Sequence, residues 1–203
     1  MEYYDSVVNE FNCLHVWKCS RQYIINHYRS HISNYHLEIG PGSGYFLKRD
    51  ILRKNPSINK LTLIDVNDDI LDYSKQNLKD EYSNDITTLN TDIFSHTIPS
   101  DIQFKSVGIN YVLHCIPGSL HENIDTLLTN LNSTNYNIFG ATVISDPIHM
   151  NPIAEYELMV LNSLGIFNNK NDTYEEFQEY LINQKIKHTI TKRGYVALFT
   201  INI

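Results

Sequence analysis

The chain alternates between short apolar runs and longer segments in which apolar residues recur every three or four positions. Short runs of apolar and β-branched residues predict strands, and the longer spacing predicts helices with one buried face. Five such runs predict strands, at residues 35–39, 61–65, 86–90, 104–111 and 138–144. The last run is almost wholly apolar, which indicates a strand buried on both faces.

Helical spacing and helix-start signals fill the intervals between these strands. Ser119 with Glu122, and Thr173 with Glu176, form capping-box patterns that predict helix starts. The predicted helices cover residues 5–32, about 44–53, 68–81, a segment after Ser119, 152–164, and 174 to about 184. Two β-rich runs, 186–192 and 195–203, flank Arg193-Gly194 and predict a terminal hairpin.

The alternation of strands and helices predicts an α/β fold with a mainly parallel sheet covered by helices on both faces. The terminal hairpin would bring the sheet to seven strands and add an antiparallel edge. No repeat or linker divides the chain. We therefore expect an N-terminal helical cap at residues 1–34 and a single structural unit at residues 35–203. Ligands of such sheets bind beyond the carboxyl ends of the strands, where the strand order reverses.

Charge and composition exclude several classes of function. The 203 residues include 16 Lys and Arg against 23 Asp and Glu, a net charge of −7, and show no basic stripe. This balance argues against nucleic acid or an anionic membrane as partner. Three cysteines are too few for a disulfide framework. With no apolar run of membrane-spanning length and no secretion signal at the start, we expect a cytoplasmic protein.

A glycine-rich turn follows the first predicted strand, in the run LEIGPGSGYFL at residues 37–47. Gly40, Gly42 and Gly44 allow a tight turn and let a ligand approach the backbone closely. A dinucleotide site requires G-x-G-x-x-G/A, but Tyr45 stands at the third small position. Glu38 would also repel a pyrophosphate. The spacing therefore favours a cationic or hydrogen-bond-donating ligand over NAD, although a nucleotide-dependent oxidoreductase remains an alternative.

The same run resembles the first motif of class I S-adenosylmethionine-dependent methyltransferases, E/D-x-G-x-G-x-G. The resemblance covers roughly residues 35–203 and implies a Rossmann-like enzyme with S-adenosylmethionine as cofactor. It implies that Glu38 and the three glycines contact this cofactor, and that Asp65, with Val66 beside it, holds the ribose hydroxyls. Asp65 could otherwise be a charge at a helix N-terminus.

The resemblance extends to the third and fourth strands. Asp92 matches the acidic position beside the adenine amino group, with Ile93 next to it, and Asn110 falls where the fourth strand meets the active site. The alternative interpretation of Asp92 is a simple loop turn. A leading helix often covers the cofactor in this family, so Tyr3, Tyr4, Trp17 and Arg21 could belong to a lid. Aromatic residues at helical spacing are also typical of plain core.

Two histidines are candidate catalytic residues because methyl transfer often requires removal of a proton from the acceptor. His114 follows the fourth strand and His149 the fifth, both at the ligand-binding edge. A buried histidine bonded to backbone is an equally good interpretation of His114. The helical pair His27 and His31 has metal-ligand spacing but no third ligand. We expect no metal.

The proposed reaction is methyl transfer to a small-molecule acceptor, at an O, N or C nucleophile, by in-line displacement. Apolar residues between 146 and 172 predict a partly hydrophobic acceptor pocket. The stretch NYVLHCIPG also resembles one in small bacterial and fungal methyltransferases of secondary metabolism. A binding module that holds S-adenosylmethionine or S-adenosylhomocysteine without chemistry is the main alternative. The sequence leaves the acceptor and the oligomeric state open.

Overall fold

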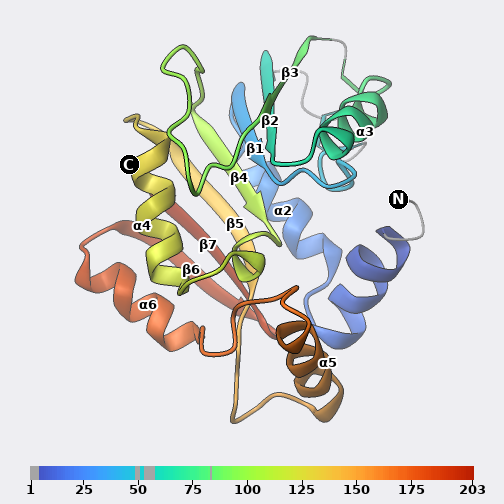
Figure 1. The fold of residues 1–203 in the computed structure, drawn as a ribbon, viewed down its shortest axis with the longest axis vertical. Helices are drawn as coiled ribbons and strands as arrows, with labels where there is room; N and C mark the ends of the chain where they lie inside the picture. Colours follow the sequence, from blue (N-terminus) through green and yellow to red (C-terminus); the bar gives the residue numbers. More distant parts are fainter. Residues whose placement is uncertain (1–4, 49–50, 53–57, 83) are drawn as a thin grey trace.

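The structure is a computed structural model that describes residues 5–48, 51–52, 58–82 and 84–203. In these ranges a seven-stranded sheet has the order β3-β2-β1-β4-β5-β7-β6 (Figure 1). The strands are β1 (Tyr35–Ile39), β2 (Lys60–Asp65), β3 (Ile86–Asn90), β4 (Ser106–Asn110), β5 (Asn137–Val143), β6 (Lys187–Arg193) and β7 (Val196–Asn202). The predicted α/β fold class is confirmed.

Strand direction also agrees with the prediction. β1 to β5 pair in parallel, whereas β7 runs antiparallel to both β5 and β6. Because β1 pairs with β2 on one side and β4 on the other, the strand order reverses between β1 and β4. The carboxyl ends of these two strands therefore border the crevice in which open α/β sheets bind ligands.

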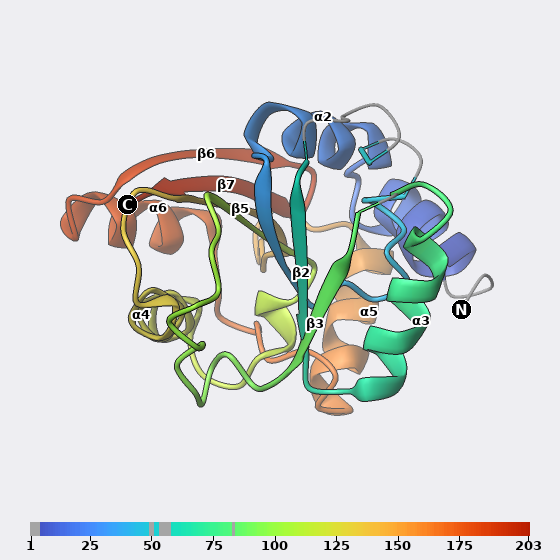
Figure 2. The same cartoon turned by 90° about the horizontal axis from the view of Figure 1, so that it is seen from above.

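Helices cover both faces of the sheet (Figure 2). Apolar residues of α2 (Arg21–His31), α3 (Asp68–Leu78) and α5 (Pro152–Ser163) join one buried cluster, and those of α4 (Leu120–Leu131) and α6 (Tyr174–Asn183) join a second. Ser119 and Thr173 form the two predicted capping boxes, at the starts of α4 and α6. Within the described ranges, no helix combines the length and apolar content needed to cross a bilayer.

The prediction of one continuous helix at residues 5–32 is wrong. The segment consists of a π-helix, η1 (Asp5–Val16), and the separate helix α2. Lys18 adopts a left-handed backbone with φ of 56° and ends the first helix. The carbonyl of Trp17 then accepts a hydrogen bond from the backbone N–H of Tyr195, in the β6–β7 turn. This long-range contact holds the break in place.

The helix predicted at residues 44–53 is also wrong where the structure describes it. The described residues form turns. The backbone N–H of Lys48 donates to Gly44 with helical spacing, but that of Leu52 donates to Leu47, five residues earlier. Leu47, Ile51 and Leu52 are all at least 97% buried in the core cluster that includes residues of α2 and α3. Packing of these side chains therefore holds the segment in place of regular helical hydrogen bonds. Residues 49, 50 and 53 lie outside the described ranges.

Strand β6 forms one edge of the sheet. Its residues alternate between exposed and half-buried, and it carries Lys187, Lys192 and Arg193. The shielded partner β7 is buried along nearly its whole length. The predicted terminal hairpin is thus confirmed, with its second strand inserted between β5 and the edge.

Candidate active site

The glycine turn leaves β1 with a backbone that favours glycine. Gly40, Gly42 and Gly44 have φ values of 63°, 56° and 76°. A Cβ at Gly40 would lie 2.4 Å from Val112 Cγ2, so this glycine also permits close packing. A Cβ at Gly42 would meet no atom within 4 Å. Gly42 therefore exposes bare backbone to open space at the reversal point of the sheet.

A narrow cavity of about 80 Å³ lies against this turn. It brings together five of the predicted residues: Glu38, Gly40, Gly42, Gly44 and Asn110. The remaining lining comes from Tyr28 in α2, from Pro41, Ser43 and residues 45–47 of the turn, and from Tyr111. Its volume suits one end of a ligand, whose remainder would extend toward the neighbouring strand ends.

Asn110 is the least satisfied polar group of this cavity. The side chain is 7% exposed, and neither its Oδ1 nor its Nδ2 has a hydrogen-bond partner among the described residues. An unpaired buried amide costs free energy, and ligand-binding sites are where such groups are tolerated. The next residue, Tyr111, has φ of 59°, an uncommon backbone state for a non-glycine residue. Both features make the end of β4 a candidate ligand-binding position.

Glu38 is 3% exposed and already has two partners. The hydroxyl of Tyr28 donates to its Oε1 at 2.5 Å, and His36 Nε2 lies 2.9 Å from its Oε2. Burial and the neighbouring Glu38 carboxylate hold the pKa of Tyr28 well above its usual value. The carboxylate is therefore fixed at the floor of the cavity by residues outside the glycine motif.

The acidic residues after β2 and β3 do not line this cavity. Asp65 accepts a hydrogen bond from the backbone N–H of Asn67 at 3.0 Å, and burial raises its pKa despite that bond. Val66 beside it is 65% exposed. Asp65 ends β2 directly opposite Asn90 of β3, so it stands one strand away from the glycine turn.

Asp92 accepts hydrogen bonds from the backbone N–H of Phe94 at 2.9 Å and from the hydroxyl of Ser95 at 2.5 Å. These bonds form a local turn, and they leave the neighbouring Ile93 side chain 2% exposed. The cofactor roles of Asp65, Val66, Asp92 and Ile93 stay predictions.

His114 lies in a short 3-10 helix, η2 (Leu113–Cys115), and is 3% exposed. Its Nδ1 accepts the backbone N–H of Val143 at 3.1 Å, so the neutral ring carries its hydrogen on Nε2. Burial lowers the pKa of His114 to about 3. The ring also packs against Phe167, with centroids 4.2 Å apart. This geometry makes His114 a hydrogen-bond donor more readily than a base.

His149 has the opposite environment. Its side chain is 74% exposed, and its Nδ1 lies 3.1 Å from Asp146 Oδ1. Lys192 Nζ donates to the other oxygen of Asp146 at 2.5 Å. Burial raises the pKa of Asp146, but the hydrogen bonds from Lys192 and His149 bring it below its usual value. When Nδ1 donates to Asp146, the lone pair of His149 Nε2 is available to accept a proton.

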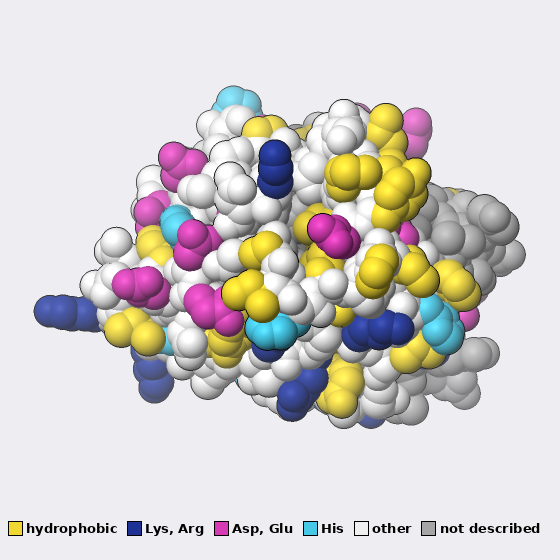
Figure 3. Space-filling view, turned by 90° about the horizontal axis from the view of Figure 1, so that it is seen from below, with side chains coloured by type: hydrophobic (Ala, Val, Ile, Leu, Met, Phe, Trp, Pro, Cys, Tyr) yellow, Lys and Arg dark blue, Asp and Glu magenta, His cyan; other side chains and the backbone are white. Residues whose placement is uncertain are grey.

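A second cavity of about 440 Å³ lies between the loop after β5 and helix α5. Its wall is mixed: Pro147, Met150, Leu158 and Met159 are apolar, and Ser145, Asp146, Glu155, Asn162, Ser163 and Lys170 are polar. Figure 3 looks at the lower face of the molecule, on which α5 lies, and shows hydrophobic side chains gathered on one half of it. Helix α5 carries exposed apolar side chains, among them Ile153, Tyr156 and Met159.

The N-terminal segment contacts the glycine turn. Ser43 Oγ donates to Asp5 at 2.6 Å, and the Tyr45 hydroxyl donates to Glu10 at 2.7 Å. The Arg21 guanidinium lies 5.2 Å from the Tyr45 ring centre. Trp17 is 3% exposed and belongs to the core. Tyr3 and Tyr4, also considered for a lid, lie outside the described residues.

The His27 and His31 rings lie 4.5 Å apart, and His27 Nε2 bonds the carbonyl of Phe199 at 2.8 Å. Across the described residues, no group of three or more His, Cys, Asp or Glu could hold a metal ion. Sequence reasoning missed Tyr28, His36 and Tyr111. Tyr111 directly follows Asn110, and that position was the available signal. The partnership of Tyr28 and His36 with Glu38 arises only from tertiary packing.

The chain is similar to methyltransferases both in sequence and in fold. No family model matches the chain. It is 29% identical to demethylluteothin O-methyltransferase of Streptomyces thioluteus over 97% of this chain and 84% of that protein. It is 29% identical to the N-methyltransferase vrtF of Penicillium aethiopicum over 81% of this chain and 68% of that protein. A SAM-dependent methyltransferase from Aquifex aeolicus shares the fold, with a TM-score of 0.61, 12% identity and coverage of 96% and 94% of the two chains.

The relatives are named methyltransferases and the fold is that of a SAM-dependent methyltransferase, which together support a class I, Rossmann-like methyltransferase with S-adenosylmethionine as methyl donor. The family resemblance predicted from the glycine motif is confirmed. Several similar methyltransferase structures are larger, and the chain spans 50%, 52% and 51% of the length of three of them.

Proposed function

We propose that the chain transfers a methyl group from S-adenosylmethionine to a small, largely apolar acceptor. The observation that carries the proposal is the pairing of open backbone at Gly42 with the unpartnered amide of Asn110, in one cavity at the strand-reversal point. A ligand bound there can accept hydrogen bonds from backbone N–H groups and can pair with the side-chain amide of Asn110, which has no partner among the described residues.

The described residues fit the donor along its length. Glu38 and Asn110 offer acceptors to an ammonium group, and the glycine turn admits the methionine part without side-chain obstruction. Asp65, at the end of β2, offers a carboxylate to two vicinal hydroxyls, and the exposed Val66 offers an apolar contact to a purine. The bound donor supplies an electrophilic methyl on a sulfonium. The protein's contribution is to orient the acceptor nucleophile in line with it.

The second cavity is the acceptor site in this proposal. The apolar part of its wall suits an aromatic compound and the polar part an oxygen or nitrogen substituent on it, in keeping with the O- and N-methyltransferase names of the relatives. His149 accepts the proton of the acceptor at Nε2, and Asp146 keeps its Nδ1–H oriented. His114 donates a hydrogen bond from Nε2. The described part of the predicted helical cap contacts the glycine turn through Asp5, Glu10 and Arg21.

Replacement of Asp65 tests the donor site. Asp65→Ala removes the carboxylate expected to accept both ribose hydroxyls, and charged hydrogen bonds of this kind are each worth roughly 1.5–3 kcal/mol. Calorimetric titration with S-adenosylhomocysteine should show at least a tenfold loss of affinity. The control Asp68→Ala removes an acidic residue from the first turn of α3 and should bind like the unchanged protein. Equal affinities for the two variants would contradict the proposed ribose contact, and NAD binding would contradict the methyl-donor site.

Obstruction of the second cavity tests the acceptor site. Ser163 lines this cavity and is exposed, so Ser163→Trp adds bulk without disturbing the core. Release of S-adenosylhomocysteine is measured against a panel of phenolic and heteroaromatic acceptors. We expect at least a tenfold rise in KM for every active acceptor, with unchanged donor affinity. Ser163→Ala serves as control. If Ser163→Trp methylates the panel as well as Ser163→Ala does, the acceptor lies elsewhere.

A further inference from the structure

His36 and Glu38 occupy alternate positions of β1 and point to the face of the sheet that α2 covers. The register places Leu63 of β2 on one side of Glu38 and Gly108 of β4 on the other. A Cβ at Gly108 would lie 2.2 Å from Glu38 Oε2 and 3.1 Å from His36 Cε1. The absent side chain at Gly108 therefore makes the room for this carboxylate and imidazole inside the core.

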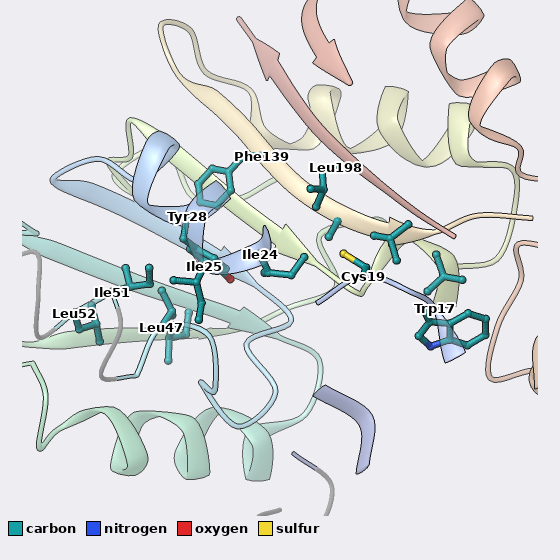
Figure 4. Packing of buried hydrophobic residues seen from close by; sticks show 14 of the residues in the cluster. Trp17, Cys19, Ile24, Ile25, Tyr28, Leu47, Ile51, Leu52, Phe139 and Leu198 are labelled. Atoms are coloured by element: carbon teal, nitrogen blue, oxygen red, sulfur yellow. The ribbon is translucent and has the colours of Figure 1, made fainter. Parts of the chain in front are cut away.

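The Glu38 carboxylate is held on both oxygens. Tyr28, Glu38 and His36 are each at most 3% exposed. Figure 4 shows Tyr28 extending from α2 beside Phe139, and the two rings pack edge to face at 5.1 Å. In the described part of the chain, His36 is the one side chain able to carry a positive charge that bonds Glu38. Since a lone buried carboxylate is costly, His36 is its natural counter-ion.

The second ring nitrogen of His36, Nδ1, faces the hydroxyl of Ser106, which can form a hydrogen bond with either the charged or the neutral ring. Nδ1 lies 2.9 Å from the hydroxyl oxygen of Ser106, which also accepts the backbone N–H of Ser33 at 2.9 Å. A serine hydroxyl both donates and accepts. It accepts from Nδ1–H when His36 is charged and donates to Nδ1 when the ring is neutral with its hydrogen on Nε2. His36 can thus gain or lose a proton with every hydrogen bond kept.

No other charged group competes for this site among the described residues. Around His36, β2 contributes Leu61, β4 contributes Ser106 and β5 contributes the stacked ring of Phe139, none of them titratable. From α2, His27 and His31 also stack on Phe139, but His27 bonds the carbonyl of Phe199 and His31 Nε2 lies 3.2 Å from the Thr200 hydroxyl. Tyr28 completes the set, with its hydroxyl on Glu38.

We propose that His36 and Tyr28 are positioning residues for the methyl donor that act through Glu38, and that donor binding releases a proton from His36. In the free protein the imidazolium neutralises Glu38. When the ammonium group of the donor's methionine part enters the cavity, it supplies a second positive charge beside the carboxylate. The proton on His36 Nδ1 then passes to solvent, and the neutral ring keeps its Nε2–H on Glu38. The inference rests on the proposed donor site.

Calorimetric titration with S-adenosylhomocysteine, which retains the ammonium group, tests this coupling. Titrations in phosphate and in Tris, whose ionisation enthalpies differ, give the number of protons released. We expect the unchanged protein to release a proton when the ligand binds, and its affinity to rise with pH. His36→Gln keeps a donor to Glu38 but cannot titrate, so both effects should vanish. Tyr28→Phe should keep the proton release while binding roughly tenfold more weakly.

His27→Gln is the matched control, because His27 lies on α2 next to Tyr28 and its ring packs against the same Phe139, while its Nε2 bonds the Phe199 carbonyl and not Glu38. It should retain the proton release and the pH dependence. Proton release that persists in His36→Gln would overturn the inference, and so would binding by the unchanged protein in which the two buffers give the same enthalpy. The latter result needs no variant to fold. If the unchanged protein does not bind S-adenosylhomocysteine at all, the donor site itself fails, which is a separate and recognisable outcome.

Discussion

Gly42→Ala is expected to abolish donor binding while the protein stays folded. With φ of 56°, an alanine here carries a left-handed backbone penalty of about 1 kcal/mol. Its methyl group meets no protein atom within 4 Å, so it projects into the space that the ligand needs. We expect a fall in Tm of a few degrees, about 2–4 °C per kcal/mol at this size. Calorimetry with S-adenosylhomocysteine should show no binding.

Gly165→Ala provides a matched control for this variant. Gly165 follows α5, has φ of 68°, and a Cβ there also meets nothing within 4 Å. Its backbone penalty should therefore be similar, but it does not line the cavity at the glycine turn. We expect the two variants to lose similar thermal stability and only Gly42→Ala to lose binding. Binding by Gly42→Ala at unchanged affinity would show that the open space at Gly42 is not used by the donor.

Acidification is expected to destabilise the protein strongly through two histidines, the buried His114 and the half-buried His27. Burial lowers the pKa of His114 to about 3 and that of His27 to about 4. In the unfolded chain both titrate near the ordinary histidine value of about 6.5. Between these values the unfolded state binds more protons than the folded state, so stability falls as pH falls. The loss begins near pH 6.5 and continues down to about pH 4 for His27 and about pH 3 for His114.

The expected loss in the free energy of unfolding is large relative to the stability of an ordinary domain. Each histidine contributes at most about 1.4 kcal/mol per pH unit, and half of that at pH 6.5, so acidification from pH 6.5 to 5 costs on the order of 3 kcal/mol for the pair. Urea unfolding at several pH values measures it. His114→Asn keeps an acceptor for the Val143 N–H, and His27→Gln keeps a donor to the Phe199 carbonyl. The double variant should lose much less stability between pH 6.5 and 5. The exposed His96→Asn should behave like the unchanged protein, and a double variant with the unchanged protein's acid sensitivity would refute the assignment.

Most of the sheet was predictable because its strands are short apolar runs bounded by turns. The capping boxes at Ser119 and Thr173 similarly fixed the starts of α4 and α6, because those residues satisfy backbone groups within one turn. The break at Lys18 was not predictable. It depends on a hydrogen bond to Tyr195, at the far end of the chain, and a periodic apolar pattern carries no sign of it.

The candidate site likewise has a part that the sequence predicts and a part that it does not. Glu38, the three glycines and Asn110 come together because they end neighbouring parallel strands, and strand ends can be read from sequence. The partners of this carboxylate, Tyr28 and His36, could not be predicted, because tertiary packing alone brings the Tyr28 hydroxyl and the His36 ring to Glu38. Likewise, only the structure distinguishes His114, whose Nδ1 is occupied, from His149, whose Nε2 is open.

The charged edge strand also has a consequence for behaviour at high concentration. An unpaired strand edge can recruit another sheet, and lysine and arginine on that edge oppose such growth. Two copies meeting edge to edge would bring the like charges of Lys187 and Arg193 together, whereas Lys192 is already paired with Asp146. The repulsion is screened by salt. The protein is thereby guarded against fibrillar self-association along this edge in dilute buffer, and this protection weakens as ionic strength rises.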